Sequence, residues 1–209
     1  LGFPADIAAS FSNPTDSHTF NYAPALPGFQ LLAESAAHPL KHVRLQFPGT
    51  YDGAAIGLKV LRNMLGVLDA DTRVSVAVKP GANGKELGEV IRYWGYDPDR
   101  VDLFEQETES LFARDNGVSG RVDGGGAAML LPRVGGERAM SGDPLCPKLL
   151  NEHFSMPVVR SKLFWDGGNI LFDDVHCLIG ANTIALNIQR LGLSESEVVT
   201  AFQFEFGVD

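Results

Sequence analysis

The sequence RVSVAVKPGANGKELGEVIRYWGY, residues 73–96, predicts a strand and a helix joined by a tight turn. Valine occurs at every second position from 74 to 78, which is the period of a half-buried strand. Pro80-Gly81 ends that strand. Residues 84–93 then form a helix, and Gly95 follows as its stop. A strand that leads directly into a helix is typical of an α/β layer.

The flanking sequence repeats this pattern on both sides. Residues 42–47 alternate between polar and apolar side chains, and Pro48-Gly49 ends the alternation. Residues 54–68 carry apolar side chains at helical spacing, and residues 101–104 predict a third short strand. The order strand, helix, strand, helix, strand therefore predicts an α/β layer with crossover helices.

Shorter elements are expected after Glu105. The pattern predicts strands with a glycine-rich turn at 117–126 and one short helix at 147–154. The expected strands cover residues 110–115, 127–131, 158–159, 163–165, 169–172 and 176–180. A final helix begins at Ser194, because Ser194 and Glu197 fit a capping box, and Gly207 is placed to end it.

Composition and charge restrict the classes of function. The 209-residue chain has a formal net charge of −9, which argues against nucleic acid or an anionic membrane as a partner and suits a cationic ligand. Two cysteines form no disulfide framework, so we expect reduced thiols and a cytoplasmic protein, or a secreted or periplasmic one if a leader was removed. Residues 1–38 predict an irregular N-terminal arm, and residues 39–209 predict one α/β domain that ends within a module.

Two segments contain residues suited to binding a cation. LFARDNG, residues 111–117, contains an Arg-Asp pair at the end of a strand, and one carboxylate can accept two parallel hydrogen bonds from a guanidinium group. LFWDGGNIL, residues 163–171, places Asp166 beside Trp165, where partial desolvation would raise the pKa of the carboxyl group. The alternative is structural: the first aspartate caps a turn, and the second belongs to a hairpin turn.

The remaining reactive side chains give weaker signals. His176 and Cys177 are neighbours, but adjacent side chains of a strand point to opposite faces, so they do not form a thiolate–imidazole pair. Cys177 is interpreted as a small core residue. The histidines have no metal-ligand spacing, and we predict no metal site.

Taken together and in this order, the motifs resemble the pentein superfamily of guanidino-group modifying enzymes. The segment 112–117 is similar to its F/W-x-R-D-x-G motif, and residues 166–169 are similar to its later acidic G-G-N/D turn. Residues 178–183 resemble the glycine-containing segment that follows. The resemblance covers about residues 40–209 and is nearest to the agmatine deiminase-like and bacterial peptidyl-arginine deiminase-like branches. It implies a partial α/β propeller of ββαβ modules around a central channel.

The resemblance also implies roles for individual residues. Asp115 would bind the substrate guanidinium, and Asp166 would bind it as well and assist proton transfer. Further substrate-binding residues would be Arg114, Trp165 and Asn169. No metal or cofactor is implied. The family's general acid and base is a histidine in an H-x-D strand, and its nucleophile is a cysteine in a late glycine-rich loop. This sequence contains neither motif, and it has Asp166 where glutamate is commoner.

Three hypotheses follow. The chain is the N-terminal portion of a guanidino-group deiminase acting on a small cationic guanidino substrate or an arginyl peptide, and it associates with itself or with a C-terminal chain. Alternatively, it is a non-catalytic guanidinium-binding module on the same fold. In the third hypothesis the motifs are coincidental, and the chain is an unrelated α/β protein whose acidic residues belong to turns.

Overall fold

The computed structural model describes residues 20–33, 39–47, 51–81, 84–106, 117–133, 155–173 and 175–208. The chain divides into two compact units. Unit 1 combines segments 1–34, 118–133 and 156–209, and unit 2 combines segments 35–117 and 134–155. The chain therefore passes between the units more than once.

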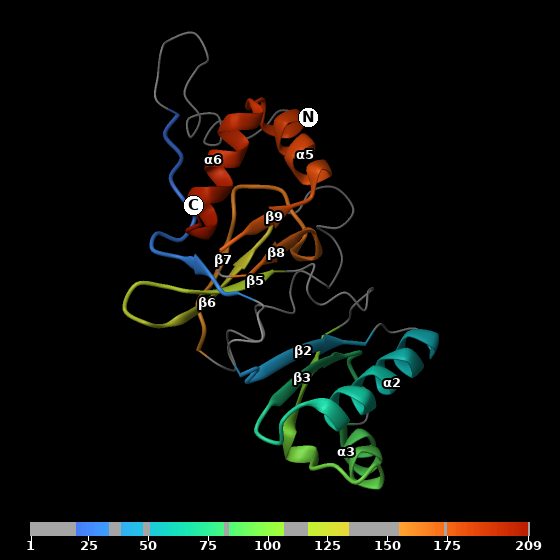
Figure 1. The fold of residues 1–209 in the computed structure, drawn as a ribbon. Helices are drawn as coiled ribbons and strands as arrows, with labels where there is room; N and C mark the ends of the chain where they lie inside the picture. The colour runs from blue at the N-terminus through green and yellow to red at the C-terminus, as the bar shows by residue number, and fades with distance from the viewer. Residues whose placement is uncertain are drawn as a thin grey trace. The chain divides into compact units, whose positions relative to one another are not determined.

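Unit 2 contains a parallel three-stranded sheet in the order β2-β3-β4. Each crossover contains a helix, α2 or α3, as the alternating pattern predicted (Figure 1). The elements are β2 (His42–Gln46), α2 (Tyr51–Val67), β3 (Arg73–Val78), α3 (Gly84–Tyr93), η1 (Pro98–Arg100) and β4 (Val101–Glu105). The predicted bounds of β3 and α3 are confirmed, whereas α2 begins three residues earlier than expected.

The two faces of this sheet differ in polarity. Val74 and Val76 are fully buried against the helices, together with Leu61 of α2 and Ile91 of α3. The opposite face includes the buried polar side chains of Gln46 and Ser75, and there the His42 Nε2 and Ser75 Oγ atoms are 2.6 Å apart.

Unit 1 contains a mixed sheet in the order β1-β5-β6-β7 and a separate antiparallel hairpin, β8-β9. Neighbouring strands are antiparallel except β6 and β7, which are parallel. The strands are β1 (Gln30–Leu31), β5 (Val118–Arg121), β6 (Ala127–Leu131), β7 (Val158–Arg160), β8 (Ile170–Phe172) and β9 (Cys177–Ile179). Helices α5 (Ala181–Leu191) and α6 (Glu195–Phe206) complete the unit (Figure 1).

The structure of unit 1 differs from several predictions made from the sequence. β5 occupies part of the expected glycine-rich turn, because Gly120 leaves room for the Phe29 ring, which lies 2.2 Å from the position of a Cβ atom at residue 120. No strand forms at 163–165, which belong to the loop between β7 and β8. Helix α5 was not predicted, and β1 lies within the expected irregular arm. The expected elements at 110–115 and 147–154 lie outside the described residues.

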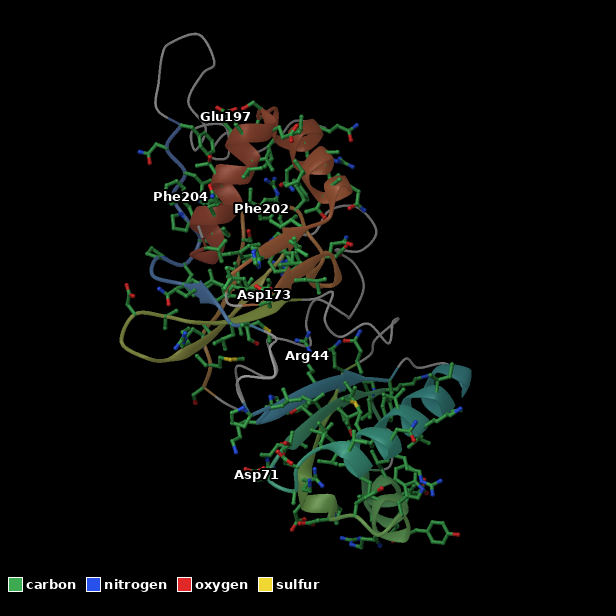
Figure 2. All side chains as sticks on the ribbon, in the orientation of Figure 1. Arg44, Asp71, Asp173, Glu197, Phe202 and Phe204 are labelled. Atoms are coloured by element: carbon green, nitrogen blue, oxygen red, sulfur yellow. The ribbon has the colours of Figure 1, made fainter. Side chains whose placement is uncertain are left out.

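The end of the chain packs against its N-terminal segment. Helix α6 has the predicted capping box at Ser194, and Gly207 ends it with φ = 61°. The buried Glu205 Oε2 atom accepts hydrogen bonds from the Tyr22 hydroxyl at 3.0 Å and the Ala25 N–H at 2.8 Å. Phe202 lies on the buried face of α6 in the core of unit 1, as Figure 2 shows. These contacts hold residues 22–31 against the last helix.

Candidate functional site in the Asp166 loop

Three of the five predicted site residues lie in one loop of unit 1, between β7 and β8. Trp165, Asp166 and Asn169 are within nine residues that link the two strands. Arg114 and Asp115 lie outside the described residues. Whether Asp115 and Asp166 converge on one pocket therefore stays a prediction.

The side chains of residues 161–167 alternate between two environments. Ser161, Leu163 and Trp165 are buried, whereas Phe164 and Asp166 are half-buried. Successive side chains of an extended segment point to opposite sides. Phe164 and Asp166 therefore share the more accessible side of the loop.

Trp165 belongs to the core. Its side chain is 4% exposed and contacts the Phe206 ring edge to face, with the ring centroids 5.6 Å apart. The indole N–H finds no hydrogen-bond acceptor within the described part of the chain. A side chain buried to this extent supports the loop from beneath, which differs from the direct substrate contact that the resemblance implied.

Asp166 precedes the short helical turn η5 (Gly167–Asn169) with extended backbone angles, φ = −119° and ψ = 135°. The Asn169 N–H donates to the Asp166 carbonyl at 2.9 Å, but the Asp166 carboxylate does not cap the turn. The hairpin of this region lies later in the chain, between β8 and β9. The interpretation of Asp166 as a residue of a hairpin turn is therefore wrong.

Asn187 fixes the loop to helix α5. This fully buried side chain accepts the Phe164 N–H at 2.9 Å and donates to the Phe164 carbonyl at 2.6 Å. It also donates to the Thr183 carbonyl at 2.8 Å. The Asn187 amide thus satisfies both polar groups of the Phe164 backbone, which belongs to none of the described strands.

The turn after Asp166 is joined to the start of α5. The Gly180 N–H donates to the Asn169 carbonyl at 3.0 Å, and Gly180 is the N-cap residue of α5. A Cβ atom at residue 180 would lie 2.8 Å from Asn182 Oδ1 and 3.6 Å from Asn169 Cβ. Only glycine fits this close approach without movement of its neighbours. The second and third motifs of the sequence are therefore in contact.

The ring of Phe164, a residue of this loop, is in contact with the guanidinium group of Arg133. The Arg133 Cζ atom lies 4.7 Å from the centroid of the Phe164 ring. The backbone N–H of Arg133 donates to the Leu163 carbonyl at 2.9 Å. Such cation–π contacts stabilise a cation on an aromatic face. The accessible side of the loop already accommodates one guanidinium group, that of Arg133.

Sequence reasoning missed Arg133 and Asn187 as site residues. Arg133 follows β6 without a recognisable motif, and the buried Asn187 resembles an ordinary helix residue. An asparagine among Ile184, Ile188 and Leu191, at helical spacing on an apolar face, was the available signal. A buried amide on such a face has to satisfy its hydrogen bonds nearby.

The two reactive residues after the loop do not form a catalytic pair. The Cys177 side chain packs against the core of unit 1 as predicted, and burial raises the pKa of its thiol. The exposed His176 ring lies 3.3 Å from Asp173 Oδ2 instead. Within the described ranges, no three His, Cys, Asp or Glu side chains are grouped to hold a metal ion. None of the helices described could cross a membrane.

The fold and loop define a mixed α/β protein with short sheets and, in the described part of the chain, four α-helices. Agmatine deiminases share this fold. A C. jejuni agmatine deiminase matches with a TM-score of 0.65 and 16% identity, over 87% of this chain and 55% of that protein. A second structure, provisionally assigned as an agmatine deiminase, matches with a TM-score of 0.68 and 15% identity, over 87% of this chain and 53% of the other.

This chain thus spans about half the length of each of the two solved structures. Comparison of the sequence with protein-family models and with curated proteins finds no match. At such low identity the likeness concerns the fold, and the fold alone does not define an activity.

Proposed function

We propose that the chain is the N-terminal portion of a guanidino-group hydrolase of the deiminase type, built from pentein-like modules. Its substrate would be a small arginine- or agmatine-like cation or an arginyl peptide. The observation that carries the proposal is the likeness to agmatine deiminases over 87% of the chain, with Asp166 held on the accessible side of its loop.

The proposal gives each described residue of the loop a role. The Asp166 carboxylate accepts hydrogen bonds from the substrate guanidinium, because charge-assisted bonds to a carboxylate are stronger than neutral ones. Phe164 offers an aromatic face beside it, and the substrate cation either displaces Arg133 or stacks nearby. Trp165, Asn169 and Asn187 hold the carboxylate in place. Arg114 and Asp115 keep the substrate-binding roles that the resemblance implies.

Hydrolysis would need groups besides these carboxylates. A thiolate forms a bond to the guanidinium carbon, a proton reaches the departing nitrogen, and ammonia leaves; water then breaks the carbon–sulfur bond and releases the ureido product. Cys177 is poorly suited to this step, because burial raises the pKa of its thiol and favours the unreactive protonated form. In the proposal, the nucleophile and the general acid and base come from elsewhere.

A second candidate is a guanidinium-binding module without catalysis. The observation that favours it is the printed sequence, which contains no H-x-D motif. The Arg133–Phe164 contact fits binding as well as it fits catalysis. The two candidates differ in whether the substrate is hydrolysed. Both assign guanidinium binding to the Asp115 and Asp166 carboxylates.

The experiment is to measure ammonia and ureido product from agmatine, free arginine and an arginyl peptide, using the protein at its full encoded length. Turnover of any one of them supports the hydrolase. Calorimetry with the same ligands tests binding separately. Asp166→Asn and Asp115→Asn should each lower affinity by more than about 1 kcal/mol, because each removes a charge-assisted hydrogen bond.

Asp173→Asn is the matched control, since Asp173 lies in the β8–β9 turn of the same unit and its carboxylate bonds the backbone of that turn. Binding without turnover would select the module. The absence of both binding and turnover would leave the coincidental interpretation and refute the proposal.

A further inference from the structure

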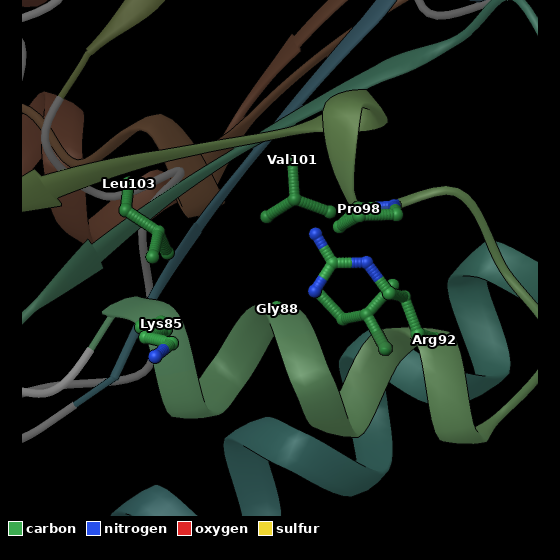
Figure 3. Close-up of a pocket in the computed structure, with 7 residues that line it drawn as sticks. Lys85, Gly88, Arg92, Pro98, Val101 and Leu103 are labelled. Carbon is green, nitrogen blue, oxygen red and sulfur yellow. The ribbon is translucent and has the colours of Figure 1, made fainter.

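A cavity of about 210 Å³ opens in unit 2 between α3, η1 and β4 (Figure 3). Its apolar wall consists of Ile91 from α3, Val101 and Leu103 from β4, and Pro98 from η1. Ile91 is fully buried, and Val101 and Leu103 belong to the margin of the same core. The cavity therefore lies at the margin of the core of unit 2.

Two cationic side chains flank this apolar wall. Lys85 and Arg92 lie on one face of α3 with Gly88 between them, because residues three and four positions apart are neighbours on a helix surface. Neither makes an ion pair or a side-chain hydrogen bond with the described residues. No lining residue is acidic, although the whole chain has a net charge of −9.

Gly88 lies beneath the Arg92 side chain. In Figure 3 the Arg92 side chain folds back over Gly88, beside Pro98. The Arg92 Nη1 atom and the Pro98 Cβ atom each lie 3.9 Å from the position that a Cβ atom at residue 88 would take. This is an ordinary van der Waals distance, so alanine would fit at this position, whereas a larger side chain would enter the cavity.

Acidic groups are present nearby but outside the cavity. Glu86 and Glu89 lie on other positions of α3, and Asp97 and Asp99 flank Pro98. The Asp97 carboxylate accepts the Asp99 N–H at 2.9 Å and is thus engaged with its own turn. Among the described residues, no carboxylate forms an ion pair with the Arg92 guanidinium.

We propose that this cavity binds a small carboxylate with a compact apolar body. Arg92 would take the carboxylate through two parallel N–H donors. The apolar wall would cover the body of the ligand, and Lys85 would add a second positive charge. A cavity smaller than the roughly 300–1,000 Å³ of a drug-sized site suits a ligand about the size of benzoate. The proposal does not depend on the function of the Asp166 loop.

The test is a titration of the isotope-labelled 209-residue chain, followed by amide resonances. Benzoate is the probe, benzamide is its neutral counterpart, and inorganic phosphate is an anion without an apolar body. Benzoate should give saturable shifts confined to α3, η1 and β4, and it should bind at least about tenfold more tightly than either control, which corresponds to about 1.4 kcal/mol.

Variants connect these shifts to the cavity. Gly88→Leu should abolish binding by filling the space, and Arg92→Gln should weaken it about tenfold. Lys59→Gln removes one exposed charge from α2 as the matched control and should bind as before. Equal affinity for benzoate and benzamide, shifts spread over the whole chain, or undiminished binding in Arg92→Gln would overturn the proposal.

Discussion

Asn187→Ala tests whether one buried amide holds the candidate site in place. The substitution removes an acceptor from the Phe164 N–H and a donor from the Phe164 carbonyl. Each polar group left without a partner away from water costs about 1–3 kcal/mol. Because Phe164 is half-buried and water can reach part of it, we expect a loss of about 2–4 kcal/mol in the free energy of unfolding. This is a large fraction of the roughly 5–15 kcal/mol that stabilises a typical domain.

The assay is urea unfolding followed by tryptophan fluorescence. The chain has two tryptophans, and Trp165 lies in unit 1 whereas Trp94 lies in unit 2. In a Trp94→Phe background the signal therefore reports unit 1 alone. Asn182→Ala is the matched control, since Asn182 is an exposed asparagine of the same helix and its Oδ1 atom bonds the neighbouring Thr183 N–H.

We expect the control to lose less than about 1 kcal/mol, because water replaces an exposed hydrogen bond at little cost. If Asn187→Ala lost no more than Asn182→Ala, the amide would not hold the loop, and the reasoning would be refuted. Under the proposed function, Asn187→Ala should also weaken guanidinium binding in the absence of urea, where the variant remains folded.

Three further predictions concern unit 1. Gly207→Ala should lower the free energy of unfolding by well over about 2 kcal/mol, because the new Cβ atom would lie 2.2 Å from a backbone carbonyl oxygen. Gly192→Ala has open space around its new Cβ atom and should lower it only by the roughly 1–2 kcal/mol of a left-handed residue. Equal losses in urea unfolding would contradict this prediction. Burial, and to a smaller extent the Glu205 carboxylate, raises the pKa of the Tyr22 hydroxyl above its unfolded value of about 10. The neutral hydroxyl therefore contributes its full stability below about pH 10, and this contribution is lost as the pH rises further. Tyr22→Phe should flatten the decline in unfolding free energy between about pH 9 and pH 11. Leu171 and Leu178 form a cross-strand pair that is 53% and 63% exposed, so the chain should self-associate in sedimentation and Leu178→Ser should reduce that association; a monodisperse unaltered monomer would contradict it.

The sequence predicted unit 2 better than unit 1, and the reason is local. β3 and α3 are adjacent in the chain, and their hydrophobic periods match their final environments. In unit 1 the decisive contacts are distant. Gly120 reads as a turn residue, but the Phe29 ring, 91 positions away, makes it part of a strand.

The candidate site shows the same limit. Asp166 was found because its acidic, glycine-rich turn is a contiguous motif. Residues 163–165 predicted a strand, yet the Phe164 backbone bonds the Asn187 side chain and not a neighbouring strand. The N-cap residue of helix α5 is Gly180, which has no side chain to cap the helix. The sequence therefore lacks the usual signal for a helix N-terminus at this point.

The bond between the Tyr22 hydroxyl and Glu205 joins residues 183 positions apart. During synthesis on the ribosome, residues 39–106 emerge early and supply all three strands and both helices of the parallel sheet. The segment at Tyr22 can pair with β5 and contact Lys162 earlier, but its hydroxyl gains the Glu205 carboxylate only after α6 has been translated. Contacts between residues so far apart slow folding, so the Tyr22 hydroxyl lacks this acceptor throughout the synthesis of residues 23–204.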